Sequence, residues 1–345
     1  MKELLKELSL SFGPSGCEDG VREIIEKFLV ANMPEGAELI KDRNGGIFLH
    51  IGKEDKPRLM VSAHMDEVGF MVTAIEENGN LRFDCVGGID PIVLASKRVV
   101  SENGRLGSII AKPIHLLSQE ERGKKTQVKD MMIDIGAVSR KEAEELTFVG
   151  EFFTFDSDYV EYGNGFVKCK ALDDRLGCAI MCMAVKEIKE KGLVLPWDLY
   201  FAFTCREEVG YSGAFGASRL IEPDYAVVIE SKAVADIYGV GDRQKVCNLG
   251  EGAIISFADR GTLYDRDFTR YLMELCDKNG IKYQTHKMIS GGNDSAHIQK
   301  TAGGCRVGLL SAASRYIHSP SDVVHYEDLE AIYQALICVI KEGVK

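Results

Sequence analysis

Apolar residues recur at helical spacing near both ends of the chain and in its second half. Leu4, Leu5 and Leu8 share one face and predict an N-terminal helix. The spacing of residues 15–18 fits a capping box, which predicts the start of a second helix running to about Val30. Helices are therefore expected at about 2–10, 15–30 and 176–191, after Gly213, and at about 327–341.

Short, almost continuously apolar runs alternate with these helices and are typical of buried strands. The pair Asn44-Gly45 separates two β-rich runs and is a strong signal for a hairpin. The expected fold class is α/β, with a mixed sheet between layers of helices. The predicted strands cover 39–42, 47–51, 58–63, 165–172, 199–204, 225–229 and 305–310, with the last of these as the final clear strand.

The pattern changes between residues 67 and 162. Short β-rich runs alternate there with Gly and Asn turns, and little helix is expected before about 141–146. The charged, aperiodic stretch 118–129 is expected to be an exposed loop. We therefore predict an inserted, barrel-like β-rich domain at 67–162, within a main domain formed by 1–66 and 163–345.

Composition excludes several classes of partner. The 345 residues carry a formal net charge of −11, which argues against nucleic acid or an anionic membrane as the main partner. No apolar run approaches the ~20 residues of a membrane span. The first eight residues alternate charge with leucine, unlike a secretion signal. Ten scattered cysteines without a C-x-x-C pair indicate free thiols in a reducing cytoplasm.

Candidate chemistry gathers where the predicted strands end. Carboxylates and imidazoles are costly to bury at such positions unless their charge is compensated. Because ligands of open α/β sheets bind beyond the carboxyl ends of the strands, these side chains are expected to meet. They are His64, Asp173, Glu207, Glu208, Glu230 and His318.

Each of these residues also has a structural interpretation. Glu207 and Glu208 alone would suit a solvated acidic turn, and a lone His64 would suit a satisfied core histidine. Asp173 and Asp174 would suit the positive end of a helix dipole. Asp66, two residues after His64, is well placed to orient a metal-binding imidazole.

Taken together, the set favours a metal site. Two histidines and at least three carboxylates suit zinc, cobalt or manganese. The set is larger than one tetrahedral ion with an open position requires, which favours two divalent ions per subunit.

Four motifs, in this order, resemble those of the tetrahedral aminopeptidases. These enzymes belong to the glutamyl-aminopeptidase family of dinuclear metallopeptidases, some members of which carry the label endoglucanase. The resemblance covers nearly the whole chain and includes residues 13–16 and 134–137. The four motifs are Ala-His-Met-Asp-Glu-Val-Gly at 63–69, Ala-Leu-Asp-Asp-Arg at 171–175, Glu-Glu-Val-Gly at 207–210 and Arg-Tyr-Ile-His-Ser-Pro at 315–320.

The resemblance implies a role for each candidate residue. His64 and Glu230 would complete one ion's shell, with Asp66 orienting His64. Asp173 would bridge both ions, and Glu208 and His318 would complete the other shell. Glu207 would be the general base that activates a metal-bridging water, so that N-terminal residues are released from peptides.

Two positions depart from the family's usual pattern. Glu230 stands where most relatives have Asp, and both residue types ligate zinc. Asn293 stands where Thr is more common, and we assign it no role beyond the loop bordering the pocket. In the family the insert is a dimerisation domain, and dimers form a hollow tetrahedral dodecamer. We therefore expect a homo-oligomer acting on peptides.

Two other functions stay open from the sequence. A glycoside hydrolase needs only paired carboxylates, but it leaves both candidate histidines and Asp173 unexplained. A non-catalytic assembly protein of the same fold is the second alternative. His115 and His297 are expected to be structural, although His297 could border the pocket. Three further histidines receive no role from the sequence: His50, His286 and His325.

Overall fold

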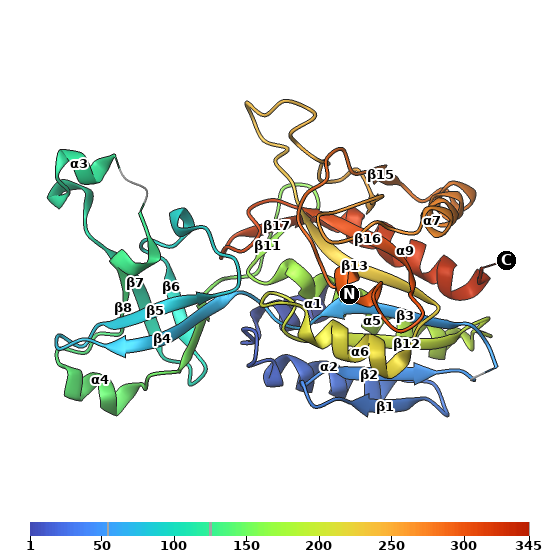
Figure 1. Cartoon of the computed structure of the whole chain (residues 1–345), viewed down its shortest axis with the longest axis horizontal. Helices are drawn as coiled ribbons and strands as arrows, with labels where there is room; N and C mark the ends of the chain where they lie inside the picture. The colour runs from blue at the N-terminus through green and yellow to red at the C-terminus, as the bar shows by residue number, and fades with distance from the viewer. Residues whose placement is uncertain (54, 124–125, 345) are drawn as a thin grey trace.

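The computed structural model describes residues 1–53, 55–123 and 126–344, and a mixed eight-stranded sheet lies at its centre (Figure 1). The strand order is β1 (Glu38–Lys41), β2 (Ile47–Ile51), β12 (Asp198–Thr204), β3 (Arg58–His64), β13 (Tyr225–Ala233), β16 (Arg306–Ser314), β14 (Ala253–Ile255) and β15 (Tyr283–Thr285). The four central strands β12, β3, β13 and β16 are parallel neighbours. Their carboxyl ends therefore share one edge of the sheet.

Helices cover both faces of the sheet, each over its own apolar cluster. On one face α5 (Leu172–Lys191) packs against β3 and β13, beside α1 (Lys2–Leu10), α2 (Asp19–Asn32), α7 (Arg266–Asn279) and α9 (Tyr326–Glu342). On the other face α6 (Ser212–Ile221) packs against β12, next to α8 (Ser295–Ile298). The predicted α/β fold class with a mixed sheet between helical layers is confirmed.

A closed barrel projects from one side of this three-layered body (Figure 1). Around the barrel run β4 (Gly69–Ile75), β5 (Leu81–Val86), β8 (Met131–Asp134), β7 (Leu106–Ala111), β6 (Arg98–Ser101) and β9 (Phe152–Phe155). Its interior is apolar, and Phe70 packs edge-on against Phe83 and Phe155 at ring centroid distances of 5.3 and 5.1 Å. The predicted barrel-like architecture is present, with α4 (Arg140–Leu146) against β4.

The connection between β3 and the barrel is held by a buried charge cluster around Glu67. The Glu67 carboxylate accepts hydrogen bonds from Lys170 Nζ at 2.6 Å and from Thr154 Oγ1 at 2.7 Å. Arg175 Nη2 lies 3.5 Å from the same carboxylate. Because Thr154 belongs to the barrel and both cations belong to the main body, one carboxylate joins the two parts.

A small antiparallel sheet lies beside the main one. It consists of β10 (Val160–Tyr162), β11 (Phe166–Cys169) and β17 (Asp322–His325), in that order. The prediction that 305–310 is the final strand is therefore wrong. β17 contains only two consecutive apolar residues, Val323 and Val324, which is too short a run to be noticed in the sequence.

Three further predictions need correction. The capping box at 15–18 does not form, because the Ser15 hydroxyl donates to Asp66 and α2 begins only at Asp19. The strand expected to stop before Glu230 continues to Ala233, so Glu230 lies within β13. The stretch 118–129, expected to be a loop, contains the one-turn helix α3 (Gln119–Arg122) and the start of the 3₁₀ helix η3 (Val128–Asp130); residues 124 and 125 lie outside the described part.

Two further predictions from the sequence were free cysteine thiols and the absence of a membrane-spanning segment. All ten cysteines are free. Among the described residues, no helix is both long enough and apolar enough to cross a bilayer.

The Glu67 cluster generates a prediction about stability. Glu67→Gln should lower the free energy of unfolding by about 3 kcal/mol, because it leaves the buried Lys170 and Arg175 cations without a counter-charge. Urea denaturation followed by circular dichroism measures this change.

The matched control is Glu77→Gln, which removes the exposed ion pair between Glu77 and Arg140 Nε, 2.9 Å apart. Exposed pairs add little stability, so this variant should unfold at the wild-type urea concentration. Equal midpoints for both variants would show that Glu67 does not hold the barrel to the main body.

Candidate metal centre

The candidate residues lie at the shared carboxyl edge of the central parallel strands. His64 is the last residue of β3 and pairs in register with Thr204, the last residue of β12. The turn carrying Glu207 and Glu208 therefore starts next to His64. On the other side of β3, β13 brings Glu230 to the same edge, and the loop after β16 supplies His318.

Asp66 fixes the turn after β12 to the loop after β3. Its fully buried carboxylate accepts the backbone N–H groups of Glu207 at 3.0 Å and Glu208 at 3.2 Å, and the Ser15 hydroxyl at 2.6 Å. Burial works against the charged form, but His64 and these donors outweigh it and lower the pKa of Asp66. The carboxylate is thus ionised and places two glutamates at once.

Asp66 also contacts His64, mainly through its backbone. His64 Nδ1 lies 3.1 Å from the Asp66 carbonyl oxygen and 3.4 Å from its carboxylate. Because Nδ1 donates to that carbonyl, the lone pair of Nε2 is free to bind a metal ion. Nε2 points toward Asp173 and Glu230.

Asp173 lies between the two imidazoles. One of its carboxylate oxygens is 3.4 Å from His64 Nε2, and the other is 3.3 Å from His318 Nε2. Glu230 approaches the His64 side at 3.6 Å, whereas Glu208 approaches His318 at 3.2 Å. The result is two adjacent donor groups that share a single carboxylate.

Neighbouring groups hold this arrangement in place. Asp173 donates its backbone N–H to the buried Asp322 carboxylate at 3.3 Å. His318 Nδ1 lies 2.5 Å from the carbonyl oxygen of Gly88, a residue that follows β5 of the barrel. The barrel therefore orients one of the two imidazoles.

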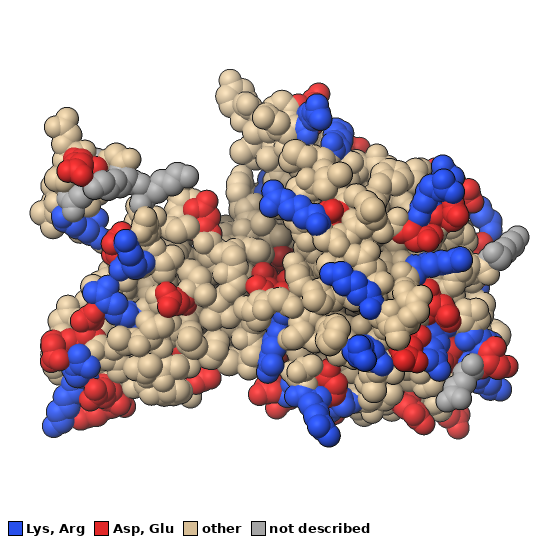
Figure 2. All heavy atoms as spheres, in the orientation of Figure 1, with Lys and Arg blue, Asp and Glu red and all other residues tan. Residues whose placement is uncertain are grey.

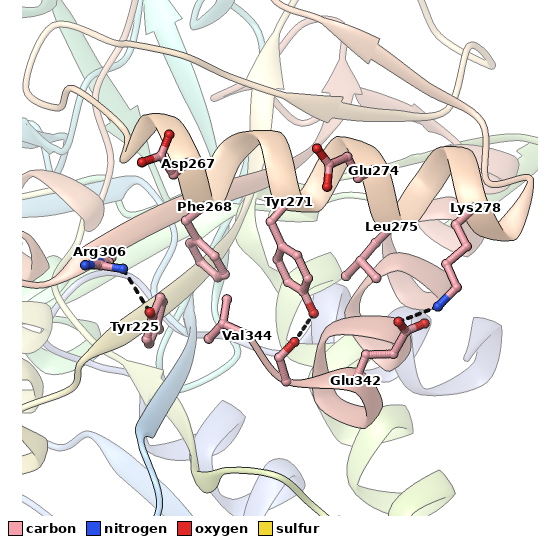
Figure 3. A pocket seen from close by; sticks show the side chains of 11 residues that line it. Tyr225, Asp267, Phe268, Tyr271, Glu274, Leu275, Lys278, Arg306, Glu342 and Val344 are labelled. Carbon is pink, nitrogen blue, oxygen red and sulfur yellow. Dashed lines mark hydrogen bonds and ion pairs between the residues drawn. The ribbon is translucent and has the colours of Figure 1, made fainter.

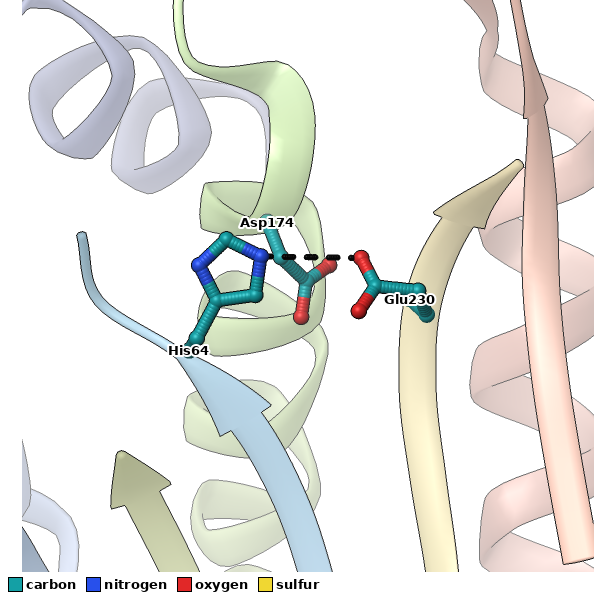
Figure 4. A group of neighbouring side chains, drawn as sticks. All are labelled: His64, Asp174 and Glu230. Atoms are coloured by element: carbon teal, nitrogen blue, oxygen red, sulfur yellow. Dashed lines mark ion pairs between the residues drawn. The ribbon is translucent and has the colours of Figure 1, made fainter. Parts of the chain in front are cut away.

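Asp174 belongs to the same cluster, although the sequence suggested only a helix N-terminal charge. It is fully buried, and one ligand atom each of His64, Asp174 and Glu230 lie within 4.8 Å of one another (Figure 4). The Asp174 carboxylate accepts the Gly177 N–H at 3.2 Å through one oxygen, and the other oxygen has no hydrogen-bond partner among the residues that the structure describes. The peptide bond between Asp173 and Asp174 is cis.

The cluster contains more buried carboxyl groups than imidazoles, so its groups would carry excess negative charge if all the acids were ionised. Burial raises the pKa values of Asp174, Glu207 and Glu230 well above their ordinary values, and it also raises that of Glu208. The pKa values of the two imidazoles are raised as well, because the neighbouring carboxylates favour the imidazolium form. Although burial disfavours its cation, His318 has a pKa of about 12, because hydrogen bonds to Asp173 and Glu208 outweigh the burial.

The donor set fits divalent metal ions. Among the described residues, no Lys or Arg pairs with Asp173, Glu208 or Glu230, and Asp173 Oδ1 is buried without a hydrogen-bond partner. Imidazole nitrogens with carboxylate oxygens are ligands for zinc, cobalt and manganese. Within the described part of the chain, groups of three or more potential ligands occur only here.

The cluster borders a pocket of about 580 Å³ that is lined mainly by the main body, with Gly88 of the insert at its edge. Figure 2 shows acidic atoms recessed in the hollow between these two parts. Tyr211 and Lys232 also line the pocket, and no sequence pattern predicts this, because segments distant in sequence meet there. Asn293 lines the pocket as expected, and its amide donates to Tyr264 Oη at 3.1 Å.

A second cavity, of about 420 Å³, lies beside α7 near the C-terminus (Figure 3). Tyr225, Phe268 and Tyr271 form its aromatic wall. Tyr225 begins β13, whereas Glu230 lies toward the other end of that strand. The cavity is therefore separate from the candidate metal centre.

The other histidines have local contacts. His50 lies 2.6 Å from Asp198 and stacks on Tyr200, and His325 contacts the Asn164 carbonyl oxygen at 2.7 Å. His297 packs near the ring of Tyr211 at 5.2 Å, which places it beside the pocket wall. His115 is exposed in the 3₁₀ helix η2 (Ile114–Leu116). None of these four joins the metal-ligand group among the described residues.

Comparison with known proteins gives a consistent result. The M42 glutamyl aminopeptidase family profile matches residues 45–334. A putative aminopeptidase from Acetivibrio thermocellus is 34% identical over 98% of this chain and 97% of its own length. A TET aminopeptidase from a marine sediment archaeon, Thaumarchaeota archaeon SCGC AB-539-E09, is 32% identical, with a TM-score of 0.95 over 99% of this chain and 96% of that one.

A third similar protein is a TET1 peptidase from Pyrococcus horikoshii, described as assembling into a tetrahedron or a large octahedral shell. It is 33% identical and has a TM-score of 0.87 over 99% of both chains. The resemblance to the tetrahedral aminopeptidases is thus confirmed, and with it the hydrolase class. The chain belongs to the M42 glutamyl aminopeptidase family.

Proposed function

We propose that this protein is a dinuclear metal-dependent aminopeptidase that releases N-terminal residues from peptides. The observation that carries the proposal is the position of the Asp173 carboxylate, with one oxygen facing His64 and the other facing His318. A carboxylate with a nitrogen donor on each side is suited to bridging two ions. Family membership supports the aminopeptidase class.

The proposed ligands fall into two sets that share Asp173. His64 and Glu230 would hold one ion, and Glu208 and His318 would hold the other. Glu230 can serve in place of the usual Asp, because its carboxylate already reaches to 3.6 Å from His64 Nε2. Zinc, cobalt and manganese all suit this donor set.

When bound, the ions would polarise the scissile carbonyl and lower the pKa of the attacking water. Glu207 is the proposed general base, taking a proton from that water and giving it to the departing amine. Its backbone is fixed by Asp66, and burial raises its side-chain pKa well above the ordinary value. A raised pKa suits a carboxylate that must both accept and release a proton near neutral pH.

The aminopeptidase class of the family supports action at a free N-terminus. Glu207, Glu208 and Glu230 all line the pocket, but two divalent ions bound there would compensate most of their negative charge. The free amine of a peptide would then bind a metal ion or an acidic side chain. An internal peptide bond offers no such amine, which favours removal of terminal residues over internal cleavage.

We further propose that residues 67–162 form a self-association domain and that the chain assembles into dimers and then a dodecamer. On this barrel, Ile92 and Val138 are 83% and 82% exposed. Assembly is supported by a structural neighbour, the TET1 peptidase from Pyrococcus horikoshii, which is described as assembling into a tetrahedron or a large octahedral shell. The free cysteines fit the reducing cytoplasm that the sequence predicts.

A glycoside hydrolase explains the site less well. Its two catalytic carboxylates would leave the imidazoles of His64 and His318 without a function. A non-catalytic assembly protein would not need charged residues buried around an unpartnered carboxylate oxygen.

Glu207→Gln should remove nearly all activity, by about 10²–10⁴-fold, because the amide cannot accept the proton of the attacking water. Its metal content should be unchanged, because Glu207 is not a proposed ligand. Rates on leucyl p-nitroanilide and metal content by plasma mass spectrometry measure both quantities.

Glu190→Gln, on the exposed surface of α5, is the matched control and should match the wild type in both measurements. A fully active Glu207→Gln variant would exclude this residue as the base.

Removal of metal should abolish peptidase activity reversibly. Dialysis against EDTA is expected to inactivate the protein, and adding zinc, cobalt or manganese should restore hydrolysis of aminoacyl p-nitroanilides. Hydrolysis of cellulose that survives EDTA, without action on aminoacyl substrates, would instead favour the glycoside hydrolase.

A further inference from the structure

Tyr211 brings a phenol hydroxyl into the pocket that contains the proposed base. Its side chain lines this pocket together with Glu207 and Glu230. The hydroxyl makes no hydrogen bond to any residue that the structure describes. By contrast, Asn293, another neutral donor of the pocket lining, donates its amide to Tyr264 Oη at 3.1 Å. The hydroxyl proton of Tyr211 is therefore available to a molecule bound in the pocket.

The backbone folds back after Glu207 and places Tyr211 beside that residue. Gly210 and Tyr211 both have left-handed backbone, with φ of 115° and 62°. The N–H of Tyr211 donates to the carbonyl oxygens of Arg206 and Glu207, at 3.0 and 3.2 Å. A positive φ is unfavourable for a bulky side chain, and residues in that conformation cluster at functional sites. One strained turn therefore carries both the proposed base and the phenol.

Contacts with two other segments limit where the Tyr211 hydroxyl can lie. The phenol ring packs against the imidazole of His297, on α8, with ring centroids 5.2 Å apart. The hydroxyl oxygen is close to the backbone of Gly292, because a Cβ atom at that position would lie 3.2 Å from it. Gly292 also lines the pocket. The ring is thus held between α8 and the loop before it, with its hydroxyl at the pocket wall.

Tyr211 is a neutral donor near several acids. Burial raises its pKa to about 12, and the charges of Glu207 and Asp294 contribute to the rise. The phenol therefore keeps its proton at neutral pH. A fixed neutral donor of this kind stabilises a negative charge that develops only in the transition state.

We propose that Tyr211 is a further catalytic residue, which donates a hydrogen bond to the oxygen of the scissile carbonyl as that oxygen becomes negative. The inference rests on the proposed aminopeptidase function and adds a residue to its site. The oxygen of the attacking water adds to the carbonyl carbon, the π electrons move to the carbonyl oxygen, and Glu207 takes a proton from the water. When the C–N bond breaks, the C=O bond re-forms and the departing amine takes that proton from Glu207. Tyr211 keeps its own proton throughout.

The first test removes the hydroxyl and keeps the ring. Tyr211→Phe should lower kcat and kcat/KM together, by about 10- to 10²-fold, and change KM by less than about 2-fold, because the hydrogen bond forms in the transition state. Steady-state rates measure this on whichever of the leucyl, lysyl and glutamyl p-nitroanilides the wild type hydrolyses fastest. The urea midpoint of unfolding should not change, since the hydroxyl has no partner among the described residues.

Tyr238→Phe is the matched control, because Tyr238 is fully exposed and lies outside the pocket lining. It makes the same chemical change and should match the wild type in kcat, KM and urea midpoint. A wild-type kcat in Tyr211→Phe would overturn the proposal. A rise in KM with kcat unchanged would also overturn it, because the hydroxyl would then bind the substrate and its transition state equally.

A binding measurement makes the test independent of turnover. An aminoalkylphosphonic acid with the side chain of the best substrate presents tetrahedral anionic oxygens, whereas the amino alcohol with the same side chain does not. In calorimetric titrations, Tyr211→Phe should weaken binding of the phosphonic acid by about 10-fold and that of the amino alcohol by less than about 2-fold. Equal weakening of both compounds would indicate a general effect on the pocket and contradict the proposal.

The two levels of the account fail in different ways. A wild-type protein that is inactive on every aminoacyl p-nitroanilide would refute the proposed function, and the role of Tyr211 with it. An active wild type with an equally active Tyr211→Phe variant would refute the role of Tyr211 alone.

Discussion

Negative charge buried at the ends of the central strands is the constraint on which the rest of the structure depends. Asp66, Glu67 and Asp173 are all buried within a short distance of His64, yet each is compensated differently. Asp66 receives two backbone N–H groups and a hydroxyl, and Glu67 receives two cationic side chains. Among the described residues, Asp173 is faced by two imidazoles, and one of its oxygens lacks a hydrogen-bond partner. Of the three, Asp173 is the one that metal ions would complete.

The barrel takes part in the same charge network. Thr154, on β9, donates to Glu67, and the carbonyl oxygen of Gly88 orients His318. The small domain is therefore joined to the main body at the site itself. This connection gives the insert a role in the geometry of the proposed metal centre in addition to its proposed role in assembly.

The sequence was informative where local pattern decides structure. The helices and the central strands are predicted from the spacing of their apolar residues. The strand-end residues are predicted because apolar runs end there in a charged residue, as at His64. Ser15 was misread because its hydroxyl bonds to Asp66, 51 positions away, instead of to its own helix. Lys232 was missed because its ammonium reaches the pocket wall and donates to the carbonyl of Ser290, 58 positions away. Contacts across such distances leave no periodic trace in the chain.

The claim that Asp173 bridges two ions can be tested by crystallography. Crystals of the zinc-loaded protein, measured at the zinc absorption edge, should show two anomalous peaks per subunit on either side of the Asp173 carboxylate, about 3.5–4 Å apart. His64 and Glu230 should contact one peak, and Glu208 and His318 the other. A single peak, or peaks that do not touch Asp173, would contradict the account.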